Sequence, residues 1–181
     1  ISPEGKLLNS FTVGEREWNI VDSMATDAQG RLYMRMRMQE DGSYVRIYSA
    51  EGELIGTVAD DDSYAVQGAG ALGQGKDGKV YAAAQAVGNT TAGDMAMTLV
   101  SVDPESLRLV PVAGGENVIC SADTIYPWKM VAAGVSETAD FILWGYNGVD
   151  TYRLGGTEFT RVQENWEMPC GTEGTCAVLV P

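Results

Sequence analysis

Four aromatic residues, each just ahead of a short apolar segment, are the side chains best suited to bind a ligand. They are Trp18, Tyr64, Trp128 and Trp166. Aromatic rings offer flat stacking surfaces to a sugar or a peptide. The same rings also fill the seams between packed sheets, and this packing role is the commoner one for large aromatic residues. The sequence leaves both roles open.

Two cysteines, Cys170 and Cys176, flank a short stretch of Gly, Thr and Glu residues. This stretch is flexible enough for the two thiols to form a disulfide, which would fit an oxidising compartment. Two reduced thiols fit the sequence equally well. Cys120 is left over and is most simply a small buried hydrophobic residue. We expect no zinc site, because the chain contains no histidine and only one close pair of cysteines.

The lack of histidine also excludes a Ser-His-Asp triad or a Cys-His pair within this chain. A glycosidase needs only two suitably spaced carboxylates, and the 25 acidic residues leave that chemistry open. Nothing in the sequence marks a particular pair of carboxylates. We therefore predict no catalytic residue, no metal and no cofactor.

Acidic residues outnumber basic ones by 25 to 12, which gives a formal net charge of -13. The resulting negative field repels phosphate backbones and anionic membrane surfaces, so we expect no nucleic-acid partner. Hydrophobic residues make up 45% of the chain, as in folded globular proteins. No apolar run approaches the roughly 20 residues that span a bilayer, so we predict no transmembrane segment.

An internal repeat sets the positions of these residues. The stretch Gln29–Tyr33 recurs as Asp77–Tyr81, with a turn, a basic residue, an aliphatic residue and a tyrosine at an offset of 48. In the same way Ser2–Ser10 parallels Ser49–Thr57 at an offset of 47, and each copy has a Glu-Gly turn followed by an apolar segment. Two independent elements that share nearly one period indicate a repeat architecture.

The pattern within each repeat predicts four β-strands separated by turns that contain glycine. In the clearest unit we expect strands at 20–26, 31–39, 43–49 and 54–59. No segment keeps a helical period over a dozen residues. We therefore predict an all-β fold, namely a β-propeller segment with about three complete blades of four antiparallel strands. The predicted blades cover residues 20–62, 65–113 and 126–163. Partial blades are predicted at both ends, with residues 1–13 as an outer strand and residues 166–181 as a loop and an inner strand.

Methionine alternates with other residues along the strand predicted in the first blade. Met34, Met36 and Met38 would lie on one face of the sheet, and Arg35 and Arg37 on the other. Because propeller blades stack on both faces, we expect the methionine side to pack against a neighbouring blade.

One region of the third predicted blade carries a family resemblance. Asp140–Trp144 and Asn147–Tyr152 are followed by Gln163–Trp166 and then by the apolar residues 177–180. This pattern resembles blade endings in the β-propeller regions of secreted Gram-positive lipoproteins of the Firmicutes type, which are often joined to an extracellular solute-binding domain. The resemblance implies an extracellular or cell-surface-anchored bacterial protein with a role in ligand sensing or solute uptake.

From these observations we expect a non-catalytic propeller region that presents a binding face. Its partner would be a small molecule, a sugar, a peptide or an adjoining solute-binding domain. One alternative is a carbohydrate-active hydrolase or lyase whose key residues lie partly in blades outside this chain. Another is a structural spacer with no ligand of its own.

Overall fold

The computed structural model describes residues 4–7, 9–12, 20–38, 42–59, 64–65, 72–86, 97–113, 127–132, 141–145, 149–155 and 158–166. These residues form three antiparallel sheets, and no helix occurs among them. The prediction of an all-β fold is therefore confirmed for the described part of the chain.

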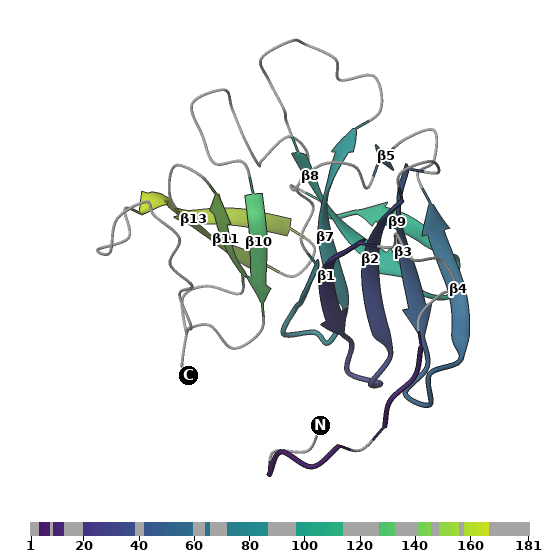
Figure 1. Ribbon diagram of the computed structural model, residues 1–181. Coiled ribbons are helices and arrows are strands. Elements are labelled where there is room, and N and C mark those ends of the chain that lie inside the picture. The colour runs from purple at the N-terminus through teal and green to yellow at the C-terminus, as the bar shows by residue number, and fades with distance from the viewer. Residues whose placement is uncertain are drawn as a thin grey trace.

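Each sheet follows the chain order of its strands. Sheet 1 contains β1 (Ile20–Thr26), β2 (Leu32–Met38), β3 (Gly42–Tyr48) and β4 (Leu54–Ala59). Sheet 2 contains β5 (Tyr64–Ala65), β6 (Leu72–Gln74), β7 (Val80–Ala86), β8 (Met97–Asp103) and β9 (Arg108–Pro111); β5 and β6 both pair with β7. Sheet 3 contains β10 (Pro127–Ala132), β11 (Phe141–Gly145), β12 (Val149–Gly155) and β13 (Glu158–Trp166). In Figure 1 sheet 3 stands on the left, and sheet 1 lies in front of sheet 2 on the right.

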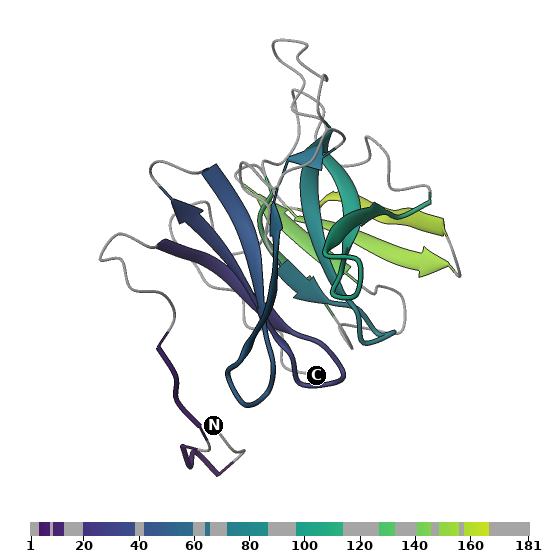
Figure 2. The ribbon, with the colours of Figure 1, turned by 90° about the vertical axis from the view of Figure 1, so that its right-hand side faces the viewer.

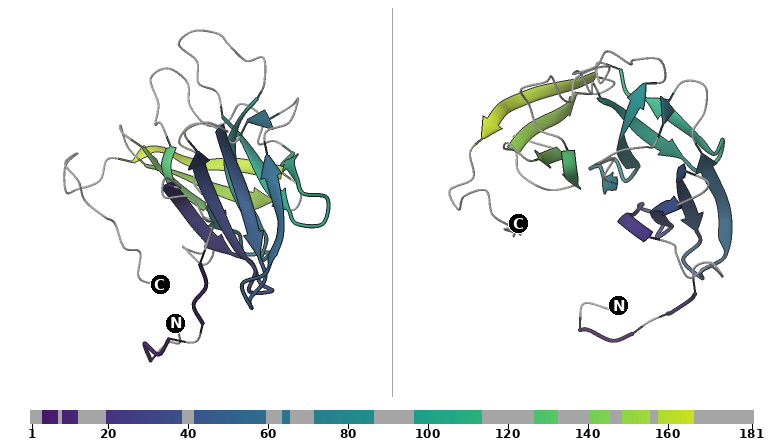
Figure 3. Two further views of the ribbon diagram at one scale, coloured as in Figure 1. Left: turned by 45° about the vertical axis from the view of Figure 1, so that its right-hand side comes forward. Right: turned by 45° about the horizontal axis from the view of Figure 1, so that its top comes forward.

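The first strands of the three sheets lie next to one another. Strand β6 has β1 on one side and β10 on the other, and the outermost strands β4 and β9 also meet. The right-hand view of Figure 3 shows the consequence: the sheets fan out along an arc, with their first strands on the inside and their last strands on the outside. Figure 2 shows sheet 1 and sheet 2 packed face to face.

The strand boundaries of sheet 1 follow closely from the sequence. Strands β1 and β4 have the predicted limits, and β2 and β3 differ from theirs by one residue at each end. The turns agree for a physical reason, since Gly30, Gly52 and Gly78 all adopt positive φ angles of 78°, 94° and 79°. Residues with a Cβ atom rarely adopt this conformation, so glycine fixes where each hairpin reverses.

The repeated turns 27–31 and 75–79 have the same backbone hydrogen bonds. The N–H of the first residue donates to the carbonyl oxygen four residues later, at 3.1 Å in the first turn and 2.8 Å in the second. The glycine N–H donates back to the carbonyl of the first residue, at 3.0 and 2.9 Å. The 48-residue repeat therefore corresponds to the same local structure in sheets 1 and 2.

One hydrophobic core fills the space between sheets 1 and 2. Both sheets contribute mainly aliphatic side chains to this core. The core residues are Tyr33, Val45, Ile47 and Val58 from sheet 1, and Leu72, Val80, Ala82, Ala84, Val100, Val102 and Leu109 from sheet 2.

The opposite side of sheet 1 carries a second apolar cluster. Met34, Met36 and Tyr48 are buried there, with Leu32 and Tyr44 packed beside them. Met24 pairs with Met34, and Leu54 pairs with Tyr48, so both lie on this side. We call these seven residues the methionine face. The predicted alternation is confirmed for residues 33–36, since Tyr33 belongs to the core between the sheets and Met34 and Met36 to the methionine face.

The turn between β8 and β9 reverses without a glycine. Leu107 adopts a φ of 54°, and its side chain lies against β4 of sheet 1. A Cβ atom at Gly56 would lie 2.6 Å from Leu107 Cδ1, so only glycine leaves room for this contact. The packing of Leu107 between the sheets therefore compensates for its backbone strain.

At Leu107 we expect a glycine variant to be more stable than an alanine variant, which is the reverse of the usual order. Both Leu107→Ala and Leu107→Gly lose the contact with Gly56, but only glycine relieves the positive φ. We expect Leu107→Gly to be the more stable of the two variants by about 1 kcal/mol, as measured by urea unfolding. A glycine variant less stable than the alanine variant would contradict this assignment of strain.

Candidate functional site

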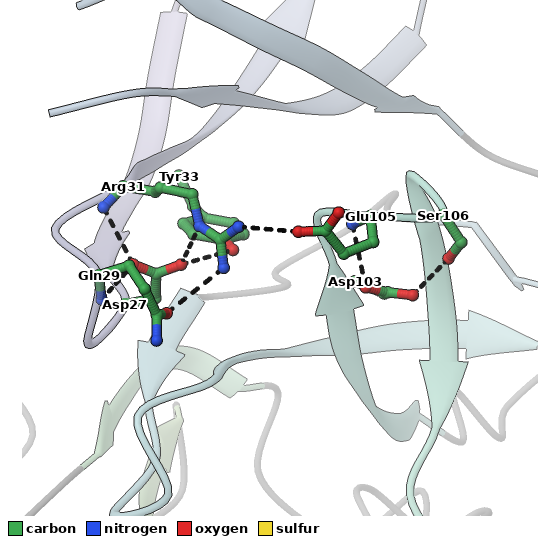
Figure 4. A network of polar contacts seen from close by, with 7 residues as sticks. All are labelled: Asp27, Gln29, Arg31, Tyr33, Asp103, Glu105 and Ser106. Atoms are coloured by element: carbon green, nitrogen blue, oxygen red, sulfur yellow. Dashed lines mark hydrogen bonds and ion pairs between the residues drawn. The ribbon is translucent and has the colours of Figure 1, made fainter. Parts of the chain in front are cut away.

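The densest polar cluster in the described part of the chain surrounds Asp27, at the turn between β1 and β2. The Asp27 residue is only 5% exposed. Its Oδ1 atom accepts hydrogen bonds from the N–H groups of Gln29 and Arg31, both at 2.9 Å. Its Oδ2 atom accepts from Arg31 Nε at 2.5 Å and from the Tyr33 hydroxyl at 3.0 Å. Figure 4 shows these residues converging on the carboxylate.

Arg31 extends this cluster from sheet 1 to sheet 2. Its Nη1 atom donates to Glu105 Oε1 at 3.3 Å, and its Nη2 atom donates to the side-chain oxygen of Gln29 at 3.4 Å. Glu105 stands in the β8–β9 turn, where Asp103 accepts from the Glu105 N–H at 3.1 Å and from the Ser106 hydroxyl at 2.6 Å. Because the Glu105 side chain is 86% exposed, we expect its ion pair with Arg31 to contribute little.

The protonation states follow from these contacts. Burial by itself would raise the pKa of Asp27, but the hydrogen bonds from Arg31 and Tyr33 outweigh it and lower that pKa below its ordinary value. Burial, together with the bond to Asp27, raises the pKa of Tyr33. Asp27 is therefore an anion, and Tyr33 remains a hydroxyl donor, over the whole physiological pH range.

A related contact recurs in sheet 2, at a shifted position. The Tyr81 hydroxyl donates to Asp77 Oδ2 at 2.7 Å, and Asp77 Oδ1 accepts from the Lys79 N–H at 3.1 Å. Burial and the bond to Asp77 raise the pKa of Tyr81. The repeat offset aligns Tyr81 with Tyr33 but Asp77 with Gln29. The two repeats thus satisfy the same buried hydroxyl from different turn positions.

The geometry around Asp27 indicates a structural carboxylate. A carboxylate has about four lone-pair sites, and here all four are occupied by donors from its own turn and strand. No site is left to accept a proton from a substrate or to attack one. The cluster is therefore suited to fixing the turn and the seam between the sheets.

The described residues add no metal or membrane-spanning feature. Among them, no group of three or more His, Cys, Asp or Glu side chains is arranged to hold a metal ion. In the same part of the chain, no helix is long and apolar enough to cross a membrane.

The candidate residues from the sequence are only partly located. Trp18 and the cysteines Cys170 and Cys176 lie outside the described residues. Tyr64 begins β5 opposite Ala86, and Trp128 is the second residue of β10, where the register with β11 shifts. Each therefore lies at the start of the first strand of its sheet, while its side chain lies outside the described part of the structure.

Trp166 lies in a different part of sheet 3. It is the last residue of β13, the outermost strand, and it pairs with Val149 of β12. Three inter-strand spacings separate β13 from β10, which amounts to roughly 14 Å between backbones. The backbone of sheet 3 thus brings Trp128 and Trp166 to the same end of the sheet but not to the same edge.

Sequence reasoning missed Asp27 as a key residue. The repeated stretch Gln29–Tyr33 begins two residues after the carboxylate that holds this turn. An aspartate ahead of a Gly-basic-aliphatic-Tyr stretch was the available signal, since Asp side chains often bond to the N–H groups of their own turn.

Compared with known proteins, the chain matches no protein-family model, no curated protein and no solved structure.

Proposed function

We propose that the chain is a non-catalytic β-propeller region of a secreted or surface-anchored bacterial protein and that it presents a binding face to a ligand or partner. The arrangement of the sheets carries this proposal. Two four-stranded sheets and one five-stranded sheet, in which β5 and β6 share the place of one edge strand beside β7, lie along an arc with their first strands innermost, as the blades of a propeller do.

The binding face would lie at the end of the sheets where their first strands begin. Tyr64 and Trp128 stand at this end of sheets 2 and 3. In a propeller, the starts of the innermost strands surround the central axis, so aromatic residues there come from several blades. Aromatic rings with few charges suit a sugar or a peptide better than a phosphorylated ligand, which the net charge of -13 would repel.

The extracellular location rests on the family resemblance of the third unit and is supported by the acidic surface charge. The Asp27 cluster offers no general base, because all the acceptor sites of this carboxylate are filled from its own turn and strand. An adjoining solute-binding domain would be the natural recipient of a captured ligand.

Glycan and peptide arrays would test the binding face. We expect one class of ligand to bind, and we expect Trp128→Ala and Trp18→Ala each to weaken that binding about tenfold, the loss of one stacking platform. Phe11→Ala is the matched control, because Phe11 contacts the β3–β4 turn at the opposite end of sheet 1. Binding that is insensitive to both tryptophan changes, or absent from every array, would contradict the proposal. Turnover of a polysaccharide would instead favour an enzyme.

A further inference from the structure

The methionine face of sheet 1 combines buried and exposed apolar residues. Met34, Met36 and Tyr48 are buried within it, whereas Met24 is 60% exposed and Leu54 is 54% exposed. Large apolar residues exposed beside a buried apolar cluster mark a surface that another element covers. The repeat identifies that element.

Met24 in sheet 1 is the counterpart of Leu72 in sheet 2. The offset of 48 aligns Met34 of β2 with Ala82 of β7. Met24 pairs with Met34 in the first sheet, and Leu72 pairs with Ala82 in the second. Yet Leu72 is only 3% exposed, because the core between the two sheets covers it.

Leu54 has a counterpart of the same kind in Leu109. Leu54 of β4 pairs with Tyr48 of β3, and Leu109 of β9 pairs with Val102 of β8. Tyr48 and Val102 each follow the residue that pairs with the repeat tyrosine of the preceding strand. Leu109 is 5% exposed and belongs to the core between sheets 1 and 2. The methionine face is therefore the repeat equivalent of the face that sheet 1 covers on sheet 2.

The N-terminal segment, residues 9–12, already lies on sheet 1 as β4 lies on sheet 2. The Asn9 side-chain amide donates to the carbonyl oxygens of Ala50 and Glu51, at 3.4 and 3.3 Å. The Phe11 ring centroid lies 5.4 Å from that of Tyr48. The offset of 47 aligns Asn9 with Gly56 of β4, which in turn lies against Leu107 in the β8–β9 turn of sheet 2.

We propose that the methionine face is an interaction surface for one further four-stranded sheet of the same repeat, with the N-terminal segment as its outermost strand. In sheets 1 and 3 the last strand in the chain is outermost, so the other three strands of the further sheet would precede this segment in the same polypeptide. A second copy of the chain fits less well, because the N-terminal segment already occupies the place of an outermost strand. The proposal rests on the repeat and is independent of any ligand.

Methionine oxidation on the complete natural polypeptide tests the proposal. Oxidation by dilute hydrogen peroxide follows the exposure of each thioether and can be mapped by mass spectrometry. We expect Met24 to oxidise as slowly as the buried Met34. Oxidation of Met24 about tenfold faster than that of Met34, as a bare face requires, would overturn the proposal. Protection of Met24 that disappears on dilution would also overturn it, because it would indicate a second copy or a separate partner.

A pair of matched variants gives an independent readout on the same polypeptide. Met24→Glu places a charge under the proposed sheet, and we expect it to lower the thermal midpoint by about 6 °C or more. Val110→Glu on β9 is the control, because Val110 is exposed with all three sheets in place, and its change should be about 1 °C or less. Equal small shifts for the two variants would overturn the proposal.

Discussion

Replacing Asp27 by Ala is expected to destabilise the protein by about 3 kcal/mol, and so to lower its thermal midpoint by roughly 6–12 °C. The change removes the acceptor of four hydrogen bonds and leaves the Arg31 side chain and the buried Tyr33 hydroxyl without their partner carboxylate. Unsatisfied buried donors carry a desolvation cost that the lost bonds alone do not express. Thermal and urea unfolding measure the effect.

Two controls separate this network from a general effect of losing an acidic residue. Asp77→Ala removes an exposed carboxylate that accepts two hydrogen bonds instead of four, one of them from the buried Tyr81 hydroxyl, so we expect about half the cost, roughly 1.5 kcal/mol. Asp27→Asn keeps an acceptor but loses the charge, and it should fall between the two. Equal costs for Asp27→Ala and Asp77→Ala would contradict the assignment.

The pH dependence of stability has a definite sign for Asp27. The pKa of Asp27 is lower in the folded state than in the unfolded chain. In an unfolded chain the pKa of an aspartate is about 3.9. The unfolded state therefore takes up a proton first. The contribution of Asp27 is complete above about pH 5 and is lost as the pH falls through 3.9 toward the lowered pKa. In the Asp27→Asn variant, the free energy of unfolding, measured by urea unfolding at several pH values, should fall less steeply below about pH 5.

Gly78→Ala is expected to cost about 3 kcal/mol, for two reasons that add. Gly78 has a φ of 79°, and a Cβ atom there would lie 2.5 Å from the Cβ atom of Ala28 in the neighbouring sheet. Ala28 sits on a turn and has no flexible side chain to move away. The clash would also disturb the 2.9 Å hydrogen bond from the Ala28 N–H to the Gly78 carbonyl oxygen. Urea unfolding gives the free energy directly.

Gly30 provides a matched control for this variant. It occupies the same repeat position with a φ of 78°, but its nearest neighbour to an added Cβ is Ala50 Cβ at 3.8 Å. Gly30→Ala should therefore cost only the backbone term of about 1 kcal/mol. In a Gly78→Ala background, Ala28→Gly should recover most of the difference. No recovery in this double variant would show that the clash is not the cause.

The sequence predicted the first sheet well because its signals are local. Alternating apolar residues and glycine turns depend only on neighbours in the chain, and they placed β1 to β4 within one residue of their observed ends. Contacts between sheets depend on residues far apart in the chain. Nothing local to Leu107 indicates that it occupies the space left by Gly56, or that Arg31 reaches Glu105.

The candidate site shows the same division. The recurrence of Tyr33 and Tyr81 was visible in the sequence, and both tyrosines are buried with a carboxylate partner. The identity of that partner was not visible, because Asp27 and Asp77 approach the two hydroxyls from turn positions two residues apart in the repeat. The repeat fixes the position of the buried tyrosine hydroxyl. The carboxylate that accepts the hydrogen bond of this hydroxyl can come from a different turn position in each copy.

The hydrogen bond between the Ala28 N–H and the Gly78 carbonyl oxygen joins two turns that belong to different sheets. Its amide proton is therefore released when the sheets part, even if every hairpin stays intact. The rate of hydrogen exchange at this amide would report how often sheets 1 and 2 separate. The exchange rates of amides inside β2 or β7 would report how often a sheet itself unfolds. A faster rate at the Ala28 amide would indicate that the sheets separate without unfolding, and equal rates would indicate that the protein unfolds as one cooperative unit.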